Sequence, residues 1–339
     1  MEHRRPLVDL AGYKAGRAVV KKAEIKLQPS PTYQGIYDGT IIGPETGCFC
    51  TTMSLDLHHI PPKVHSGVYR HDDMLLHVLG GEGYSIIDDV RYEWERGDTI
   101  HIKPGVWFQH FNPSNEPANM LAAKATPLVN SAKPFGPIVT VGEGDYVELE
   151  DTEYDHPFGL GKEKPGGSRE KGMGFFDEWR VQQKVAQNNE LKKARVIMKA
   201  KDVHWEYGSH RGELNTMLAY PGLGFDGRMP FHMGLQAIAP GGSNETHQHM
   251  DAIVYILGGK GNVIVNGVET EIEQGDCCFV HWGDHHQFKA STYSSKLFIQ
   301  MRIHLMEFLN RQFPFPFLEE RTETGVLNYA ATYVAKPPW

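Results

Sequence analysis

Apolar and polar residues alternate in short runs along this chain, and glycine ends most of the runs. Residues 75–81 read LLHVLGG and residues 83–89 read GYSIIDD, while residues 252–259 read AIVYILGG and residues 261–267 read GNVIVNG. Short runs with a period near two are typical of strands that bury one face, so each pair predicts a β-hairpin. The last run ends in Asn266-Gly267, a dipeptide that favours a two-residue hairpin turn.

The same pattern occurs twice at a constant spacing, which indicates an internal duplication. Residues 61–83 align with residues 239–261 at an offset of 178 residues, and the same offset places Gly97-Asp98 on Gly275-Asp276. Matching residues are Pro62, His71, Leu79, Gly81 and Gly83, which fall on Pro240, His249, Leu257, Gly259 and Gly261. An uninterrupted repeat of this length predicts one domain in two copies, each a small antiparallel barrel or jelly roll.

The rest of the chain is divided around these copies, and the predicted fold class is all-β with a few short helices. We expect an N-terminal barrel over residues 1–150, a linker and helix over 151–195, a C-terminal barrel over 196–310 and a tail over 311–339. Glycine, lysine and glutamate are frequent in residues 159–174, as in linkers. Helix-forming residues predict a helix near 176–194 and a second short helix at 305–313.

Composition and charge narrow the possible partners. The chain has 42 acidic and 34 basic residues, a net charge of −8 and no stripe rich in lysine and arginine, which argues against nucleic acid. Its start has no apolar signal core, and no apolar stretch is long enough to cross a membrane, so we expect a cytoplasmic protein without a membrane partner. The four cysteines are expected to be buried free thiols. Eighteen histidines stand out as candidate chemistry.

A cluster of histidines in the second copy has the spacing of a metal site. His247 and His249 stand two residues apart on a predicted strand, so their side chains should share a face. His281, His285 and His286 follow Gly275-Asp276 within a short span. Three neutral imidazoles on a barrel wall can hold a divalent transition metal and leave coordination positions open. A small-molecule substrate at such a site is therefore expected.

These segments resemble the two consensus motifs of the cupin superfamily. Residues 241–249 read GGSNETHQH and residues 283–286 read GDHH after Gly275-Asp276. The resemblance extends over both copies and implies a bicupin, with His247, His249 and His286 as metal ligands and His285 as the nearest competitor of His286. The glutamate that many cupins carry after the second histidine is absent, and Asp251 is the only nearby carboxylate. Whether Asp251 also binds the metal is left open.

A site of three histidines is similar to that of gentisate and salicylate dioxygenases, which cleave aromatic rings with Fe(II) and O2. The large subunit of hydroquinone dioxygenases is a second match, because its C-terminal cupin holds the iron, although its motif differs from His-x-His. In the first copy the corresponding residues are Tyr69, His71 and Phe108, so we expect the N-terminal barrel to be metal-free. A displaced site that uses His71 and His110 remains an alternative.

Several residues near the triad are candidates for substrate binding. In residues 297–304, Phe298, Gln300, Arg302 and His304 share one face of a predicted strand. If that face points into the barrel, Gln300 and Arg302 bind the substrate, and Arg302 pairs with its carboxylate or phenolate. A polar stripe facing solvent is the alternative. Trp282 is a candidate for stacking on the substrate ring. His285 and His304 are the candidates for catalytic proton transfer.

Together these features predict an Fe(II)-dependent dioxygenase that cleaves the ring of a hydroxylated aromatic compound with O2. The alternative metal is manganese or another divalent transition metal. Alternative functions are a redox-neutral metal enzyme, such as an isomerase, hydrolase or decarboxylase, and a bicupin without catalytic activity. Since open barrel edges need cover, we also expect a homo-oligomer or a heteromer with a small subunit.

Overall fold

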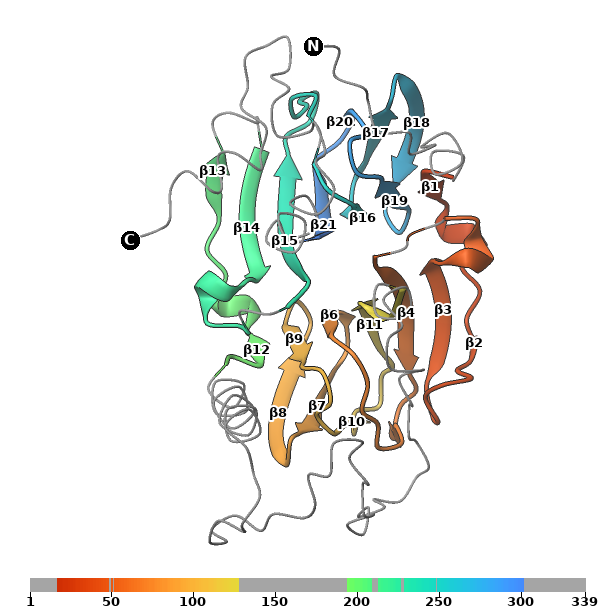
Figure 1. The fold of residues 1–339 in the computed structure, drawn as a ribbon, viewed down its shortest axis with the longest axis vertical. Helices are drawn as coiled ribbons and strands as arrows, with labels where there is room; N and C mark the ends of the chain where they lie inside the picture. The colour runs from red at the N-terminus through yellow and green to blue at the C-terminus, as the bar shows by residue number, and fades with distance from the viewer. Residues whose placement is uncertain are drawn as a thin grey trace, which may run out of the picture.

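A computed structural model describes residues 17–48, 50, 52–127, 194–208, 213–226, 229–247 and 249–301. These residues form two antiparallel barrels, one above the other in Figure 1, with short 3-10 helices between some strands. The all-β, two-barrel architecture expected from the sequence is confirmed. No helix among the residues described is long and apolar enough to span a membrane.

The N-terminal barrel consists of a seven-stranded sheet, in the order β12-β9-β6-β11-β4-β3-β2, and a four-stranded sheet, in the order β5-β10-β7-β8. Its strands are β2 (Gln28–Pro29), β3 (Tyr37–Ile42), β4 (Ser54–Ile60), β5 (Val64–His65), β6 (Met74–Gly80), β7 (Glu82–Ile87), β8 (Val90–Glu95), β9 (Thr99–Ile102), β10 (Phe108–Asn112), β11 (Ala118–Lys124) and β12 (Ile197–Met198). The 3-10 helices η1 (Lys22–Glu24) and η2 (Pro44–Thr46) precede β2 and follow β3.

The C-terminal barrel repeats this arrangement with a seven-stranded sheet, in the order β1-β19-β16-β21-β15-β14-β13, and a three-stranded sheet, in the order β18-β17-β20. Its strands are β1 (Val19–Val20), β13 (Glu206–Gly208), β14 (Glu213–Ala219), β15 (Phe231–Ile238), β16 (Ala252–Gly258), β17 (Lys260–Val265), β18 (Val268–Glu273), β19 (Cys277–Val280), β20 (His286–Ala290) and β21 (Ser294–Met301). The 3-10 helices η3 (Ala200–Asp202) and η4 (Pro221–Leu223) lie before β13 and after β14.

The duplication read from the sequence extends to individual strands. The offset of 178 residues places β6 on β16, β7 on β17, β9 on β19 and β10 on β20. The predicted hairpin at Asn266-Gly267 is confirmed, because β17 pairs with β18 and both turn residues have positive φ, 49° and 82°. Two positive φ values define the turn whose twist matches that of the flanking strands.

Two short strands are exchanged between the barrels. Strand β1 lies inside the range 1–150 assigned to the N-terminal barrel, yet it pairs with β19 of the C-terminal barrel. Strand β12, from the start of the C-terminal range, pairs with β9 of the N-terminal barrel. Figure 1 shows both crossings. Each exchange covers a sheet edge that the barrel's own strands leave unpaired, which explains why the chain crosses over.

Buried aspartates fasten the two exchanged segments in the same way. Asp276 accepts hydrogen bonds from the Lys22 N–H (2.9 Å) and from Lys21 Nζ (2.9 Å) just after β1. Asp98 accepts from the Ala200 N–H (2.8 Å) and from Lys199 Nζ (2.6 Å) just after β12. The Gly-Asp pairs found by the repeat search therefore mark the points at which each barrel holds a strand from the other half.

The buried apolar residues form three clusters, one between the barrels and one inside each barrel. One contains residues of both halves, such as Leu75 and Leu121 with Ile253 and Ile299. A second fills the N-terminal barrel, and a third, which includes Val254, fills the C-terminal barrel. Neighbouring residues of β16 thus face opposite ways, as the pleat of a strand requires. The C-terminal barrel therefore has an interior wall of its own, separate from the contact with its neighbour.

The remaining sequence predictions concern the cysteines, the linker and the two helices. The four cysteines are free thiols, as expected; Cys48, Cys277 and Cys278 are buried, whereas Cys50 is only partly buried. The linker at 159–174, the short helix at 305–313 and the helix near 176–194, except for residue 194, lie outside the described residues. The boundaries at residues 150 and 310 lie outside them as well and stay predictions.

Candidate metal centre

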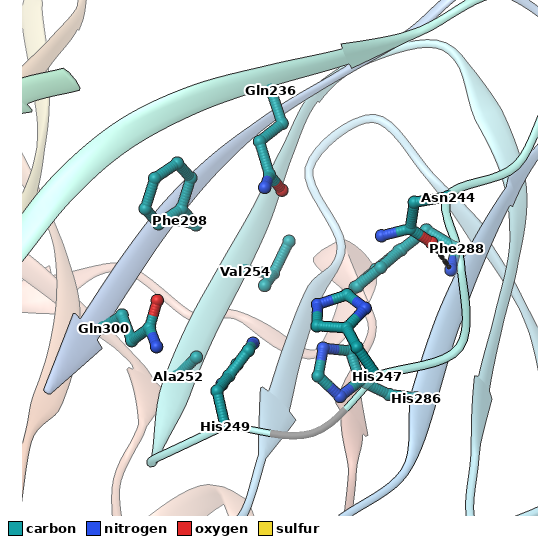
Figure 2. Close-up of a pocket in the computed structure, with 10 residues that line it drawn as sticks. All are labelled: Gln236, Asn244, His247, His249, Ala252, Val254, His286, Phe288, Phe298 and Gln300. Carbon is teal, nitrogen blue, oxygen red and sulfur yellow. Dashed lines mark hydrogen bonds between the residues drawn. The ribbon is translucent and has the colours of Figure 1, made fainter. Parts of the chain in front are cut away.

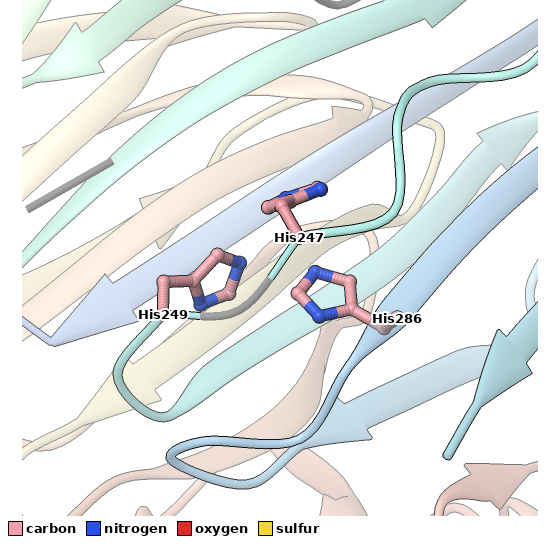
Figure 3. Close-up of side chains that lie close together, drawn as sticks. All are labelled: His247, His249 and His286. Carbon is pink, nitrogen blue, oxygen red and sulfur yellow. The ribbon is translucent and has the colours of Figure 1, made fainter. Parts of the chain in front are cut away.

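Three histidines of the C-terminal barrel come together at one point. Each of His247, His249 and His286 offers one ring nitrogen, and these atoms lie within 4.8 Å of one another. The ring centroids of His247 and His249 are 4.3 Å and 4.5 Å from that of His286. Figure 3 shows the three rings converging from the segment before β16 and from the start of β20. The grouping predicted from the sequence is therefore present.

The backbone that carries these histidines is less regular than expected. His247 forms an isolated β-bridge with His286, and each N–H donates to the other's carbonyl at 3.1 Å and 2.9 Å. His249 lies outside any strand, in the turn that leads into β16. The predicted continuous strand is thus replaced by a single bridge. The bridge still fixes His286 directly opposite His247, which is the juxtaposition that a shared ion requires.

Hydrogen bonds orient all three rings for metal binding. The Nδ1 atoms of His247, His249 and His286 lie 2.8, 2.7 and 3.1 Å from the carbonyl oxygens of Glu245, Met250 and Asp284. A carbonyl only accepts, so each Nδ1 carries a proton, and in the neutral ring each Nε2 keeps a lone pair. Burial, followed by the proximity of the other two histidines, lowers the pKa of His286 well below its ordinary value. Neutral imidazoles with free Nε2 atoms fit a divalent transition metal.

The Asp251 carboxylate, which was considered as a fourth metal ligand, is engaged in hydrogen bonds to other groups. Its Oδ2 accepts from the Thr52 hydroxyl at 2.7 Å, and its Oδ1 accepts from the Trp282 N–H at 2.8 Å. Burial raises the pKa of this carboxyl, and those two hydrogen bonds oppose the shift. Among the described residues, the group that could hold an ion contains the three histidines without Asp251. Asp251 instead ties the histidine-bearing segment to the N-terminal barrel and to the loop before His286.

The histidines open onto a pocket inside the C-terminal barrel. Figure 2 shows the lining side chains grouped around the cavity between β15, β16, β20 and β21. Beside the histidines, the lining residues are Gln236, Asn244, Ala252, Val254, Phe288, Phe298 and Gln300. The pocket therefore combines a metal-binding group with an apolar middle and three carboxamides, a composition suited to a small organic molecule.

The polar face of β21 points into this pocket and not to solvent, which was one of the two alternatives left open by the sequence. Phe298 and Gln300 line the cavity, while Leu297, Ile299 and Met301 belong to the cluster that joins the barrels. Gln300 is 4% exposed, and its Nε2 has no hydrogen-bond partner among the described residues. A buried amide donor without a partner is available to a bound molecule. Arg302 and His304 lie outside the described residues.

The other candidates lie outside the pocket lining. His285 is exposed at the turn before β20, where its N–H donates to Asn266 Oδ1 at 3.1 Å. Trp282 is half-buried against the cluster shared by the two barrels. His281 is buried with its ring 4.3 Å from that of Phe279. None of these three side chains lines the pocket. Stacking by Trp282 and proton transfer by His285 therefore stay predictions from the sequence.

Sequence reasoning missed five lining residues, Gln236, Asn244, Ala252, Val254 and Phe288. Asn244 lies within the histidine motif, where its Oδ1 accepts from the Phe288 N–H at 2.7 Å and so fixes the strand that carries His286. The repeat offered a signal for Gln236, since the offset of 178 places it on His58, a buried polar residue of the other barrel.

The equivalent place in the N-terminal barrel holds aromatic rings. Tyr69 and Phe108 form the same isolated bridge as His247 and His286, with hydrogen bonds of 2.9 Å and 2.8 Å, and both are buried. His71 keeps the orientation of its counterpart His249, because its Nδ1 lies 2.7 Å from the Asp72 carbonyl. The backbone of the site is thus duplicated, while two of its three imidazoles are replaced. His110 bonds to Ser85 Oγ at 2.7 Å through its Nδ1.

Comparisons with known proteins agree with the two-barrel architecture. The cupin domain family matches residues 56–124 and 234–297, one segment in each barrel. A comparison with curated protein sequences finds no match.

Solved structures with the same fold include an enzyme. Salicylate 1,2-dioxygenase from Pseudoaminobacter salicylatoxidans, in its adducts with gentisate, gives a TM-score of 0.57 at 16% identity over 87% of this chain and 84% of that chain. A second structure of that enzyme gives 0.56 at 16% identity, over 87% and 86% of the two chains. Protein Ylba from E. coli gives 0.53 at 12% identity, over 86% and 96%. At these identities the similarity concerns the fold. With one cupin domain matched in each of two barrels of the same strand order, the chain is a bicupin of the cupin superfamily.

Proposed function

We propose that this bicupin is a non-haem Fe(II) dioxygenase that cleaves the ring of a hydroxylated aromatic compound with O2. The observation that carries the proposal is the set of three neutral imidazoles, without a carboxylate, at a pocket with an apolar middle. His247, His249 and His286 would hold the ion, and bound Fe(II) would supply the electron transfer between substrate and O2. Since the three ligands are uncharged, they leave the ion's positive charge to attract an anionic, chelating substrate.

The remaining lining residues would position that substrate. Val254, Phe288 and Phe298 offer apolar surface to a ring and exclude water from it. The unpartnered Nε2 of Gln300 would donate to a substrate oxygen near the ion. Arg302 as a partner for a substrate carboxylate, and His285 or His304 as proton carriers, remain proposals from the sequence.

A redox-neutral metal enzyme is the rival function. Similarity to salicylate 1,2-dioxygenase supports the oxygenase proposal only at the level of fold, and Ylba, whose name states no reaction, is similar to this chain to a comparable degree. The choice therefore depends on chemistry at the site rather than on the barrel. A bicupin without catalytic activity is the second rival.

Oxygen consumption separates these functions. The purified protein is loaded anaerobically with Fe(II) or Mn(II) and then mixed with O2 and gentisate, salicylate, catechol or hydroquinone. We expect the Fe(II)-loaded protein to consume one O2 for each aromatic ring lost, and a His286→Ala variant to lose this activity. Substrate conversion without O2 uptake would contradict the proposal and support the redox-neutral rival, and no conversion of any of these compounds would support the non-catalytic one.

The proposed assembly is a homo-oligomer or a heteromer with a small subunit. Sedimentation of the purified protein at micromolar concentration tests the first possibility. A single species at the mass of one 38.2 kDa chain would contradict a homo-oligomer.

A further inference from the structure

The pocket has a polar end opposite the histidines, built from residues that the proposed metal centre does not use. Gln236 of β15 lies directly across from Lys296 of β21 in the sheet register. Glu213, the first residue of β14, contacts both of them. Gln236 lines the pocket, and Figure 2 shows its side chain reaching into the cavity.

Glu213 and Lys296 form an ion pair that is fully buried. They are 1% and 0% exposed, and Lys296 Nζ lies 3.5 Å from Glu213 Oε2 and 4.0 Å from the centroid of the Phe288 ring. Buried ion pairs contribute little net stability, because both charges lose their hydration. Strand register places Ile36 and Met120 at the corresponding positions of the N-terminal barrel. The barrel fold therefore does not require this pair, which points to a role in the pocket.

The pair fixes the orientation of the Gln236 carboxamide. Gln236 Nε2 donates to Glu213 Oε1 at 3.0 Å. A carboxylate can only accept, so the amide nitrogen must face Glu213 and the amide oxygen remains available to a molecule in the pocket. Lys296 supplies the opposite charge to Glu213 in this buried environment. The far end of the pocket thus presents a hydrogen-bond acceptor.

Strand register separates this acceptor from the metal centre. Gln300, Phe298 and Lys296 are successive residues on the inward face of β21. Gln300 pairs with Ala252, just after the histidine segment, whereas Lys296 pairs with Gln236. Figure 2 shows Phe298 between the two glutamines. A bound molecule that reached from one end to the other would meet a donor at Gln300, apolar rings in the middle and an acceptor at Gln236.

We propose that Gln236, positioned by Glu213, selects aromatic ligands that carry a hydroxyl group on the side opposite to their metal-binding oxygens. The inference rests on the proposed function and specifies its substrate class. A hydroxyl at that place donates to Gln236 Oε1, whereas a ligand without it leaves the carboxamide oxygen without a partner on the ligand. Gln236 would contact the ligand, and Glu213 would act through Gln236.

Two commercial acids that differ by a single hydroxyl group test the proposal. Gentisate and salicylate share adjacent carboxylate and hydroxyl groups, and gentisate has one additional hydroxyl across the ring. Their dissociation constants are measured by calorimetry on the Fe(II)-loaded protein under argon, so that no turnover is needed. We expect gentisate to bind about tenfold more tightly, the difference that one hydrogen bond makes.

Variants then assign that preference to the proposed residues. Gln236→Leu should remove the preference by weakening gentisate far more than salicylate, while Gln236→His, which keeps an acceptor and a donor, should retain most of it. Glu213→Gln combined with Lys296→Met removes both buried charges and frees the Gln236 amide to turn, so the preference should fall without loss of the fold. Thermal unfolding checks that each variant is folded.

The outcomes separate this inference from the proposed function. Equal binding of the two acids by the unaltered protein, or equal weakening of both in Gln236→Leu, would overturn the inference and leave the proposed function intact. Failure of both acids to bind would overturn the inference and count against the proposed function as well.

Discussion

Replacing Asp251 tests how the metal-binding segment is held in place. The carboxylate joins three parts of the molecule: the segment after His249, the Trp282 N–H in the loop before His286, and the Thr52 hydroxyl of the N-terminal barrel. Asp251→Ala removes both accepted hydrogen bonds and leaves the Trp282 N–H without its acceptor. Asp251→Asn keeps one carbonyl oxygen for Trp282 and removes the charge.

The size of the effect follows from these two bonds. Hydrogen bonds to a charged group contribute about 1.5 to 3 kcal/mol each. Burial of the Asp251 carboxylate, which raises its pKa, offsets part of that sum. We therefore expect Asp251→Ala to lower the free energy of unfolding by about 2 to 4 kcal/mol and Asp251→Asn by about 1 to 2 kcal/mol. Thr52→Val removes one bond from the opposite side and should resemble Asp251→Asn.

Urea unfolding and metal analysis are made on the same preparations. Because Asp251 supports the histidines without binding the ion, folded Asp251→Asn protein should keep the metal content of the unaltered protein. The reasoning would be refuted if folded Asp251→Asn lost its metal while Thr52→Val kept it, since the carboxylate would then be a ligand. It would also be refuted if Asp251→Ala were as stable as the unaltered protein.

Three further predictions address the fold and the substrate. Asp276→Asn and Asp98→Asn each weaken the anchoring of one exchanged strand and should each lower the free energy of unfolding by about 1 to 3 kcal/mol in urea; a loss in one barrel only would contradict the equivalence of the two anchors. Burial lowers the pKa of His110 to about 3, so the folded state keeps this residue neutral while the unfolded state binds a proton below about pH 6.5. The free energy of unfolding should therefore fall as the pH drops from about 6.5 towards 3. Urea unfolding at pH 7 and pH 5 measures this decrease, which should be about 2 kcal/mol smaller in His110→Phe than in the unaltered protein. Equal decreases in the two proteins would exclude this role of His110. Arg302→Ala should retain its metal but lose about thirty- to a thousandfold in kcat/KM on carboxylated phenols, with a smaller loss on uncarboxylated ones. Equal loss on both classes, measured by oxygen uptake, would assign Arg302 a structural role.

The parts of this molecule that could be predicted are those encoded over short stretches or by the repeat. His247 and His249 lie two residues apart, and His281, His285 and His286 follow a turn marked by glycine, so the local pattern predicted a histidine cluster. The resemblance to the cupin motifs then selected His286 as the third member. The constant offset between the copies gave the two barrels. It also identified Tyr69 and Phe108 as the replacements for two of the histidines, and the structure places both at the equivalent bridge.

The strand exchange was missed although the sequence carries a signal for it. At the same offset of 178, residues 19–24 (VVKKAE) fall on residues 197–202 (IMKAKD), including Lys21 on Lys199. The match is short and only one residue is identical. Its meaning depends on contacts with Asp276 and Asp98, more than 100 residues away in sequence.

The acceptor end of the pocket could not be predicted from local patterns. Glu213, Gln236 and Lys296 lie on three different strands, and they meet only because β14, β15 and β21 pair in one particular register. A shift of one residue would turn each of these side chains to the other face of the sheet. The role of Asp251 could not be predicted either, because its hydrogen-bond partner Thr52 comes from the other barrel.

Metal content of a matched pair of variants tests the central claim most directly. His249 and His71 are equivalent under the repeat, and both direct Nδ1 to a backbone carbonyl, at 2.7 Å in each case. Each is replaced by alanine, the proteins are loaded with Fe(II) under argon and desalted, and iron is counted per folded chain by mass spectrometry. With the site at His247, His249 and His286, the unaltered protein and His71→Ala should each hold about one iron, and His249→Ala should hold almost none. Iron that survives in His249→Ala and disappears in His71→Ala would contradict the account.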